Sequence, residues 1–308
     1  AHVSDLGASQ TRDAIAAARS AFADWKTRPL PDRVTVVQRW ANLIEEYVED
    51  LATIVCSENG KPLREARSEI LQCASLLRWY AQEVQRLHGE TLPRHNNWQQ
   101  NYTIKQPVGV VACITPWNFP AAMITRKAAA AMATGCTVVV KPAPETPLSA
   151  LALAALAHEA EIPAGVLNVI TGDAPKLAKM LCEDPRVRAL SFTGSTRVGK
   201  LLLQQTVPTL KRVSLELGGH APFIIFPDMD LETAVRDAMA AKFQTSGQDC
   251  LAANRIYVHE DIYDAFAARF SAAVANLSVG NGLSAGVEIG PLMHESAAAK
   301  CQEHIDDA

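Results

Sequence analysis

Residues 108–141 decide the fold class, and they read VGVVACITPWNFPAAMITRKAAAAMATGCTVVVK. The segment opens with a β-branched apolar run at 108–114, continues with an alanine-rich run at 121–134, and closes with a second β-branched run at 137–140. A strand, a helix and a second strand of these lengths are typical of a βαβ unit, whose strands are parallel and whose crossover is right-handed. The segment therefore predicts the centre of a parallel sheet.

The same alternation continues toward the carboxyl terminus. Further strands are predicted at 167–170, 187–192 and 211–217, and the intervening helices at 148–160, 176–182 and 196–205. This order predicts an α/β fold with a doubly wound, Rossmann-like parallel sheet. Ligands of such folds bind at the carboxyl ends of the strands, so the residues that directly follow the strands are the candidates for a binding site.

Three helices and a hairpin are predicted before this sheet. Apolar residues at helical spacing predict three helices: one at 11–25, one from a first turn near Pro31 to an end at Asn59-Gly60, and one at 62–87. Polar, uneven residues at 92–107 predict a projecting hairpin. A subunit contact and a solvated loop are both open interpretations of this hairpin.

A domain boundary is predicted at Gly218-Gly219, where two glycines permit a sharp reversal of the chain. A second α/β domain follows. Its strands are predicted at 223–226 and 256–258, and its helices at 231–243 and 262–277. Residues 280–285, GNGLSA, fit the G-x-G-x-x-A dinucleotide pattern, but they follow a helix instead of a strand and are predicted to form a loop.

The composition is that of an ordinary soluble globular protein. Of 308 residues, 48% are hydrophobic and 20% charged. The net charge of −4 does not indicate binding to nucleic acid or to an anionic membrane, which attract basic proteins. The apolar runs fall short of the roughly 20 residues of a membrane span. Seven scattered cysteines without a C-x-x-C pair predict reduced thiols in the cytoplasm and no metal site. Neither a nucleic-acid partner nor a membrane partner is therefore expected.

Cys250 is the candidate nucleophile. It lies in a polar, glycine-bearing turn, GQDC, between a predicted helix and a predicted strand. A reactive cysteine needs a polar or helix-terminal setting that favours its thiolate. The alternative is a small buried side chain, which is the usual role of a free cysteine.

Two further residues carry groups that such a nucleophile needs. Glu216 lies between apolar neighbours, so its carboxylate is expected to be buried and to serve as a general base. Asn118 follows the first strand of the sheet, where its amide is a neutral donor for a developing oxyanion. Simple turn chemistry is the alternative for Asn118.

Two strand ends have residues suited to a nucleotide. Lys141 follows the second strand, where a cation meets ribose hydroxyls or phosphate; a solvated lysine is the alternative. Gly194 and Ser195 join a strand to a helix start, whose amides suit a pyrophosphate; an ordinary serine N-cap is the alternative.

Together and in this order, these segments strongly resemble the aldehyde dehydrogenase superfamily. The matching segments are 115–120 (TPWNFP), 141–147 (KPAPETP), 192–195 (FTGS), 216–219 (ELGG) and 247–250 (GQDC). The likeness covers essentially the whole chain, and residues 123–127 and 135–157 are most similar to succinate-semialdehyde dehydrogenases.

The resemblance implies a role for each candidate. Cys250 would attack an aldehyde carbonyl, the Asn118 amide and the Cys250 N–H would hold the oxyanion, and Glu216 would activate the water that hydrolyses the thioester. Residues 1–217 would hold the dinucleotide-binding domain and 218–308 the catalytic domain. The implied cofactor site is lined by Trp117, Asn118, Lys141, Pro144, Gly194, Ser195 and Leu217.

Cofactor and substrate follow from positions that differ among relatives. Many NAD-preferring relatives have a glutamate where this chain has Pro144, so NADP is expected, with NAD as the alternative. Arg126 matches the first of two arginines that bind the substrate carboxylate in semialdehyde enzymes, but Gln244 replaces the second. Succinate semialdehyde or another ω-carboxy aldehyde, such as glutarate semialdehyde, is the expected substrate.

The resemblance also implies what this chain lacks. The later Glu-x-Phe-Gly-Pro motif of the family is absent, so the catalytic domain is expected to be incomplete at its carboxyl end. The full-length protein is expected to be a homodimer or homotetramer. Two alternatives stay open: a CoA-acylating aldehyde dehydrogenase, against which Glu216 counts, and a non-catalytic, truncated nucleotide-binding relative.

Overall fold

The computed structural model describes residues 2–307, which form two compact units. The first unit consists of Ala1–Leu51 and Glu69–Glu216, and the second of Ala52–Ser68 and Leu217–Ala308. Within the described residues, no helix is both long and apolar enough to cross a membrane.

A five-stranded parallel sheet forms the centre of the first unit. Its strands are β3 (Val110–Ile114), β4 (Thr137–Lys141), β5 (Leu167–Val169), β6 (Val187–Thr193) and β7 (Arg212–Glu216), in the spatial order β5-β4-β3-β6-β7. All residues of β3 and β4 are buried, as is typical of parallel strands covered on both faces. The predicted doubly wound sheet is confirmed.

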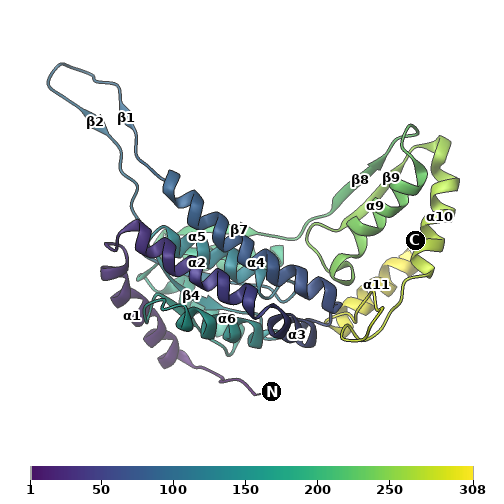
Figure 1. Ribbon diagram of the computed structural model, residues 1–308, viewed down its shortest axis with the longest axis horizontal. Coiled ribbons are helices and arrows are strands. Elements are labelled where there is room, and N and C mark those ends of the chain that lie inside the picture. The colour runs from purple at the N-terminus through teal and green to yellow at the C-terminus, as the bar shows by residue number, and fades with distance from the viewer. Residues whose placement is uncertain (1, 308) are drawn as a thin grey trace. The chain divides into compact units, whose positions relative to one another are not determined.

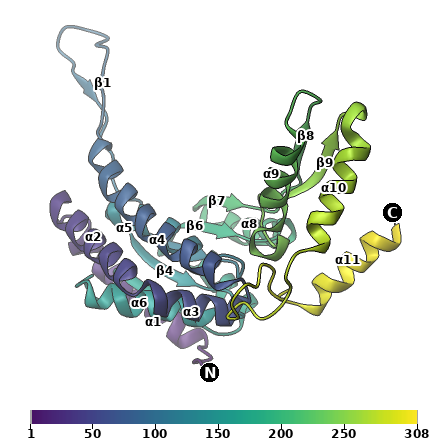
Figure 2. The same ribbon diagram turned by 45° about the vertical axis from the view of Figure 1, so that its right-hand side comes forward.

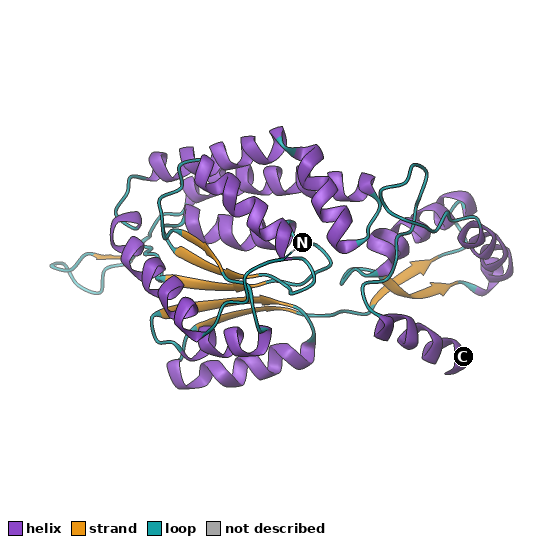
Figure 3. Ribbon diagram, turned by 90° about the horizontal axis from the view of Figure 1, so that it is seen from below, coloured by secondary structure: helices purple, strands orange, loops and turns teal. Residues whose placement is uncertain are grey.

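Helices cover both faces of this sheet (Figure 3). On one face lie α1 (Ala8–Trp25) and α7 (Ala174–Glu183), with α8 (Thr196–Thr206) beside α7. On the other lie α5 (Ala122–Ala133) and α6 (Pro147–Glu159), against which α2 (Leu30–Glu46) packs. The buried Trp40 of α2 joins this helix to α6, because its Nε1 donates a hydrogen bond to the Leu153 carbonyl at 3.0 Å.

The single helix predicted from near Pro31 to Asn59 is wrong, because two helices occupy this segment. α2 ends at Glu46, and α3 (Val48–Asn59) begins after Tyr47, whose φ of −93° and ψ of 26° are not helical. The hydrogen bonds from Tyr47 N–H to Leu43 O and from Leu51 N–H to Tyr47 O run through the kink. The apolar spacing therefore continues across it, and periodicity alone does not detect the break.

The predicted hairpin is confirmed. It follows α4 (Leu63–Glu83) and a short 3₁₀ turn (Val84–Arg86), and pairs β1 (Thr91–Leu92) with β2 (Asn101–Tyr102) in antiparallel register. Figure 1 shows it extending away from the helices of its own unit. The side chain of Trp98 at its tip is 80% exposed.

The second unit contains a two-stranded parallel sheet of β8 (Ala221–Ile225) and β9 (Ala253–Val258). Helices α9 (Leu231–Phe243) and α10 (Tyr263–Ala275) pack together beside these strands (Figure 2). The core between them holds the buried side chains of Ile225, Ala234, Val235, Ala238 and Phe266. A last helix, α11 (Glu295–Asp307), was not predicted from the sequence.

The loop predicted at 280–285 is confirmed, and its glycines have a packing role. Gly282 lies against the segment between α3 and α4, where an added Cβ would be 2.4 Å from the Lys61 carbonyl oxygen. An added Cβ on Gly290 would be 1.9 Å from the Gly60 carbonyl oxygen. Glycine is therefore required at 282 and 290 for a close approach of two backbones, and Gly282 belongs to the dinucleotide-like pattern.

Candidate active site

The sheet topology of the first unit brings the ends of four strands to one edge. At this edge Thr115 N–H donates to Lys141 O at 3.2 Å, and Gly194 N–H donates to Glu216 O at 3.0 Å. The chain winds from β3 outward through β4 and β5, and then crosses to β6 on the other side of β3. The carboxyl ends of β3 and β6 therefore flank the switch point, where ligands of doubly wound sheets bind.

Lys141 is a buried cation at this edge. It is the last residue of β4 and is only 4% exposed, so the alternative of a solvated lysine is wrong. Burial lowers the pKa of its ammonium group from 10.5 to about 8, although Glu145 partly opposes this shift. A desolvated ammonium group gains from an anionic or hydroxyl-rich ligand, so Lys141 fits a nucleotide ribose or phosphate.

The start of α8 provides a second feature of a nucleotide site. The Oγ of Ser195 accepts a hydrogen bond from Val198 N–H at 3.3 Å, so the alternative of a serine N-cap is confirmed. The first amides of a helix also attract phosphate groups, and the two roles are compatible. A larger residue in place of Gly194 would displace the buried ring of Phe192, because an added Cβ would lie 2.5 Å from its Cζ.

Three buried hydroxyl groups lie at or just after the same strand ends. Among the described residues, the Oγ1 atoms of Thr115, Thr146 and Thr193 have no hydrogen-bond partner. An unsatisfied buried polar group costs about 1–3 kcal/mol. The residues present at this edge therefore fit a polar ligand such as a dinucleotide.

The loop after β3 carries Trp117 and Asn118, which are both half-buried. A residue that sequence reasoning missed fixes the end of this loop. Glu69 of α4 is 3% exposed, and its Oε1 accepts hydrogen bonds from the N–H groups of Ala121 at 2.9 Å and Ala122 at 3.0 Å. The carboxylate thus caps the start of α5 and anchors the loop that presents Asn118.

Two predicted residues lie on the surface of their strand or loop. Pro144 is exposed. Glu216 is exposed as well, so the expectation that its carboxylate is buried is wrong. The reason is that β7 is an edge strand whose residues alternate between exposed and half-buried positions. A run of alternating apolar residues in the sequence does not distinguish an edge strand from a central one.

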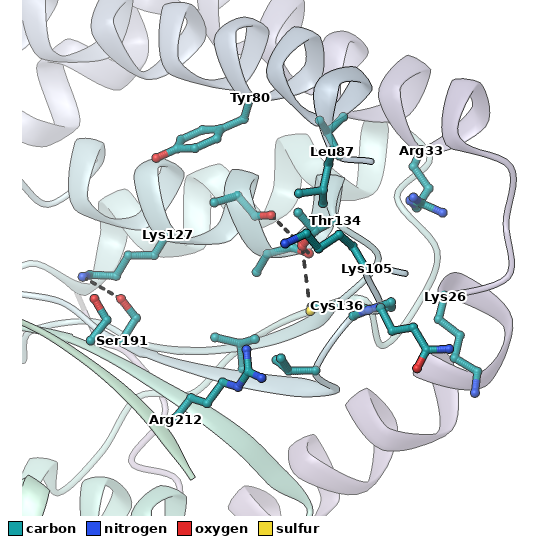
Figure 4. A pocket seen from close by; sticks show the side chains of 18 of the residues that line it. Lys26, Arg33, Tyr80, Leu87, Lys105, Lys127, Thr134, Cys136, Ser191 and Arg212 are labelled. Atoms are coloured by element: carbon teal, nitrogen blue, oxygen red, sulfur yellow. Dashed lines mark hydrogen bonds between the residues drawn. The ribbon is translucent and has the colours of Figure 1, made fainter. Parts of the chain in front are cut away.

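A cavity of about 890 Å³ lies within the first unit, beside α5 and the strands β3, β6 and β7 (Figure 4). Arg126 and Glu216 are the two predicted site residues that line it. Its charged lining is largely cationic and consists of Lys26, Arg33, Lys105, Arg126, Lys127 and Arg212, with Glu216 as the acidic residue. Lys127 donates from Nζ to Ser191 Oγ at 3.0 Å, and burial lowers its pKa. The charge balance suits an anionic ligand.

Cys250 lies in the second unit and is exposed, so the alternative of a buried cysteine is wrong. It follows a turn at Gln244–Gly247 and precedes β9. The half-buried Leu217 belongs to the same unit. Gln244 is exposed and lines a pocket of about 520 Å³ together with Glu65. An exposed thiol on a short connection between a helix and a strand is accessible to an electrophile.

Comparison with known proteins gives one consistent result. The profile of the aldehyde dehydrogenase family matches residues 1–308. The chain is 56% identical over 307 residues to the non-phosphorylating aspartate-semialdehyde dehydrogenase of Halomonas elongata, covering 100% of this chain and 62% of that protein. It is 52% identical over 306 residues to the succinate-semialdehyde dehydrogenase (NADP+) of Escherichia coli, covering 99% of this chain and 64% of that protein.

The fold agrees with solved structures. An aldehyde dehydrogenase from Brucella melitensis biovar abortus superposes with a TM-score of 0.98 at 51% identity, covering 99% of this chain and 63% of that one. The chain therefore spans slightly less than two thirds of the length of the relatives that it matches.

Proposed function

Because this chain belongs to the aldehyde dehydrogenase family, we propose that it oxidises an aldehyde to the carboxylic acid, with a nicotinamide dinucleotide as hydride acceptor. The observation that carries this proposal is the exposed Cys250 in the GQDC turn. The edge of the parallel sheet that holds the buried Lys141 and the start of α8 supports it.

The first step would take place at Cys250. Its thiolate attacks the aldehyde carbonyl carbon, a C–S bond forms, and the carbonyl oxygen becomes an oxyanion. The side-chain amide of Asn118 and the backbone N–H of Cys250 would donate hydrogen bonds to this oxygen. Removing one such donor typically costs about 2.7–4 kcal/mol of transition-state stabilisation.

When bound, a nicotinamide dinucleotide would supply the hydride acceptor that the oxidation of the Cys250 adduct to a thioester needs. Lys141 would bind the ribose hydroxyls or phosphate, and Gly194 and Ser195 at the start of α8 would bind the pyrophosphate. Glu216 would take a proton from a water molecule, which attacks the thioester carbonyl and releases the acid and the Cys250 thiolate. This hydrolysis consumes one water molecule.

We further propose a short ω-carboxy aldehyde as the substrate. Arg126 lines a cavity whose charged residues are largely cationic, which favours a carboxylate. The relatives named above act, by name, on aspartate and succinate semialdehydes. Succinate semialdehyde is our first candidate, and glutarate semialdehyde extends it by one methylene group.

We propose a cytoplasmic homo-oligomer in which the hairpin β1–β2 contacts another subunit. The exposed apolar side chains of Trp98, Tyr102 and Ile104 in and next to the hairpin support this, because such residues are enriched at protein interfaces.

The test is a panel of aldehydes of graded length, with and without a terminal carboxylate, measured with NADP+ and NAD+. We expect oxidation of the acidic aldehydes, and an Arg126→Ala variant is expected to raise their KM about tenfold while leaving that of neutral aldehydes unchanged. An unchanged KM for acidic aldehydes contradicts the role of Arg126. Turnover that requires added coenzyme A identifies an acylating enzyme, and lack of turnover with every aldehyde contradicts the proposed activity.

A further inference from the structure

Three consecutive residues before Cys250 have a left-handed backbone. Thr245, Ser246 and Gly247 have φ angles of 52°, 57° and 74°. This conformation suits glycine, but it crowds a β-carbon against the backbone, and a β-branched residue such as threonine adopts it least readily. Thr245 is also 1% exposed, so the strained residue is packed inside its unit. A strained backbone of this kind persists only where its surroundings hold it, and such backbone is common at functional sites.

Glu65 holds the first residue of this turn. Its Oε2 accepts a hydrogen bond from Thr245 N–H at 2.8 Å, although the two residues are 180 positions apart in the sequence. Glu65 lies in the first turn of α4 and is half-buried. Burial raises the pKa of its carboxyl group, while Thr245 N–H and Lys61 oppose that shift. The desolvated acceptor thus ties a rigid helix to the backbone of the turn.

Two other hydrogen bonds fasten the side chains of the same turn. Gly290 N–H donates to Ser246 Oγ at 2.9 Å, and Met293 N–H donates to Gln248 Oε1 at 2.9 Å. Within the turn, Gln248 N–H donates to Thr245 O at 3.0 Å. The contact from Glu65 differs from the first two, because it binds the backbone of the strained threonine itself. Its loss would release the residue whose conformation sets the path of the chain toward Cys250.

We propose that Glu65 is a positioning residue for Cys250, because its carboxylate holds the turn at 245–247 in the left-handed conformation and so fixes where the thiol is presented. The catalytic significance of this role rests on the proposed function, in which Cys250 is the nucleophile. Glu65 acts through the turn and contacts no reacting atom.

The test compares Glu65→Met with Glu65→Gln, which have side chains of similar length but differ in having an acceptor oxygen. Cys250 and Cys301 are the exposed cysteines, so Cys250 is labelled with a trifluoromethyl reagent in a Cys301→Ser background. Fluorine NMR should give one narrow resonance for the parent protein and for Glu65→Gln. Glu65→Met should broaden or split this resonance. Part of its intensity should move toward the fluorine chemical shift of the chain unfolded in urea.

A second substitution separates the turn from a general structural role of Glu65. Thr245→Gly, added to Glu65→Met, should restore the narrow resonance because glycine adopts the turn without the contact. Glu83→Met serves as the control, since Glu83 lies on the same helix and pairs with Arg86 on the surface. It should leave the spectrum unchanged. In aldehyde oxidation, Glu65→Met should lower kcat about tenfold and leave the KM for the dinucleotide unchanged, as expected for a displaced nucleophile.

Each outcome decides the proposal. It is overturned by a wild-type spectrum for Glu65→Met, by a double variant that keeps the broadened spectrum, or by an unchanged kcat in an active Glu65→Met enzyme. If Glu65→Met does not fold, the double variant decides: a folded protein with the narrow resonance supports the proposal, and an unfolded one overturns it. The spectrum reports the turn whatever reaction Cys250 performs. A failure of aldehyde oxidation in the parent protein would therefore refute the proposed function without changing the spectral result.

Discussion

The buried Lys141 shows how a residue proposed to bind the cofactor carries a cost in stability. Its pKa of about 8 in the folded chain lies below the ordinary value of 10.5. Between these two values the unfolded chain binds more protons than the folded chain, so the contribution of Lys141 to the free energy of unfolding rises with pH in this window. Below about pH 8 the burial penalty applies in full. A ligand that pairs with the ammonium group would offset it.

We therefore expect Lys141→Met to raise the free energy of unfolding of the first unit by about 1–3 kcal/mol at pH 7. This gain should shrink as pH rises from about 8 toward 10.5, and dinucleotide binding should weaken. Urea unfolding followed by tryptophan fluorescence measures the effect, since all five tryptophans lie in the first unit. The exposed Lys200 provides the control variant Lys200→Met, which should be near neutral. A destabilised Lys141→Met protein would contradict this assignment.

Pro144 governs a second prediction at the scale of a residue. It is exposed and three positions after Lys141, and a carboxylate there would repel the 2′-phosphate of NADP. The parent protein should therefore favour NADP over NAD in kcat/KM, and Pro144→Glu should shift the ratio toward NAD by about tenfold, or about 1.4 kcal/mol. Pro144→Ala, which adds no charge, should keep the original preference. A parent protein that prefers NAD would refute the inference from Pro144.

At the scale of elements, the start of α5 depends on a carboxylate from another helix. Glu69 accepts hydrogen bonds from Ala121 and Ala122 N–H, and its removal would leave buried donors unpaired. Glu69→Ala should lower the free energy of unfolding of the first unit by about 3 kcal/mol, and Glu69→Gln by less because it keeps an acceptor. The exposed Glu159 on α6 offers the control Glu159→Ala. Equal unfolding midpoints for Glu69→Ala and Glu159→Ala would contradict the proposed cap.

Elements with a periodic apolar pattern were predictable, and others were not. The strands β3, β4 and β6 and the helices packed on them have apolar residues at the spacing that burial requires. α11 has no buried residue, and its ESAAAKCQEHIDD sequence carries no apolar stripe. Pairs such as Lys300 with Glu303 support this helix locally, and periodicity does not detect them.

The candidate site likewise has features that the sequence predicts and features that it does not. The position of Asn118, Lys141, Gly194 and Ser195 at one sheet edge followed from the order of strands and helices. The exposure of Glu216 depends on which strand forms the edge of the sheet, and a single segment does not contain this information.

At the scale of the whole molecule, long-range contacts set the limit of prediction from sequence. Residues 52–68 belong to the second unit, where Leu63 N–H donates to Gly282 O at 2.9 Å. Thr245 likewise depends on Glu65. Hydrogen bonds between residues about two hundred positions apart leave no local pattern, so neither was visible before the fold was known. The sequence therefore indicates the turn that carries Cys250 as a candidate site, but it does not indicate the long-range hydrogen bonds that hold this turn in place.

The central claim is that Cys250 carries the acyl group during aldehyde oxidation. The most direct measurement is mass spectrometry of a Glu216→Gln variant after mixing with succinate semialdehyde and NADP+. Without the proposed base, hydrolysis should slow, so a thioester should accumulate on Cys250 together with an equal amount of NADPH. A Cys250→Ser variant should give neither product. An adduct on Cys301, or NADPH formed without any adduct on Cys250 in both the parent protein and the Glu216→Gln variant, would contradict the account.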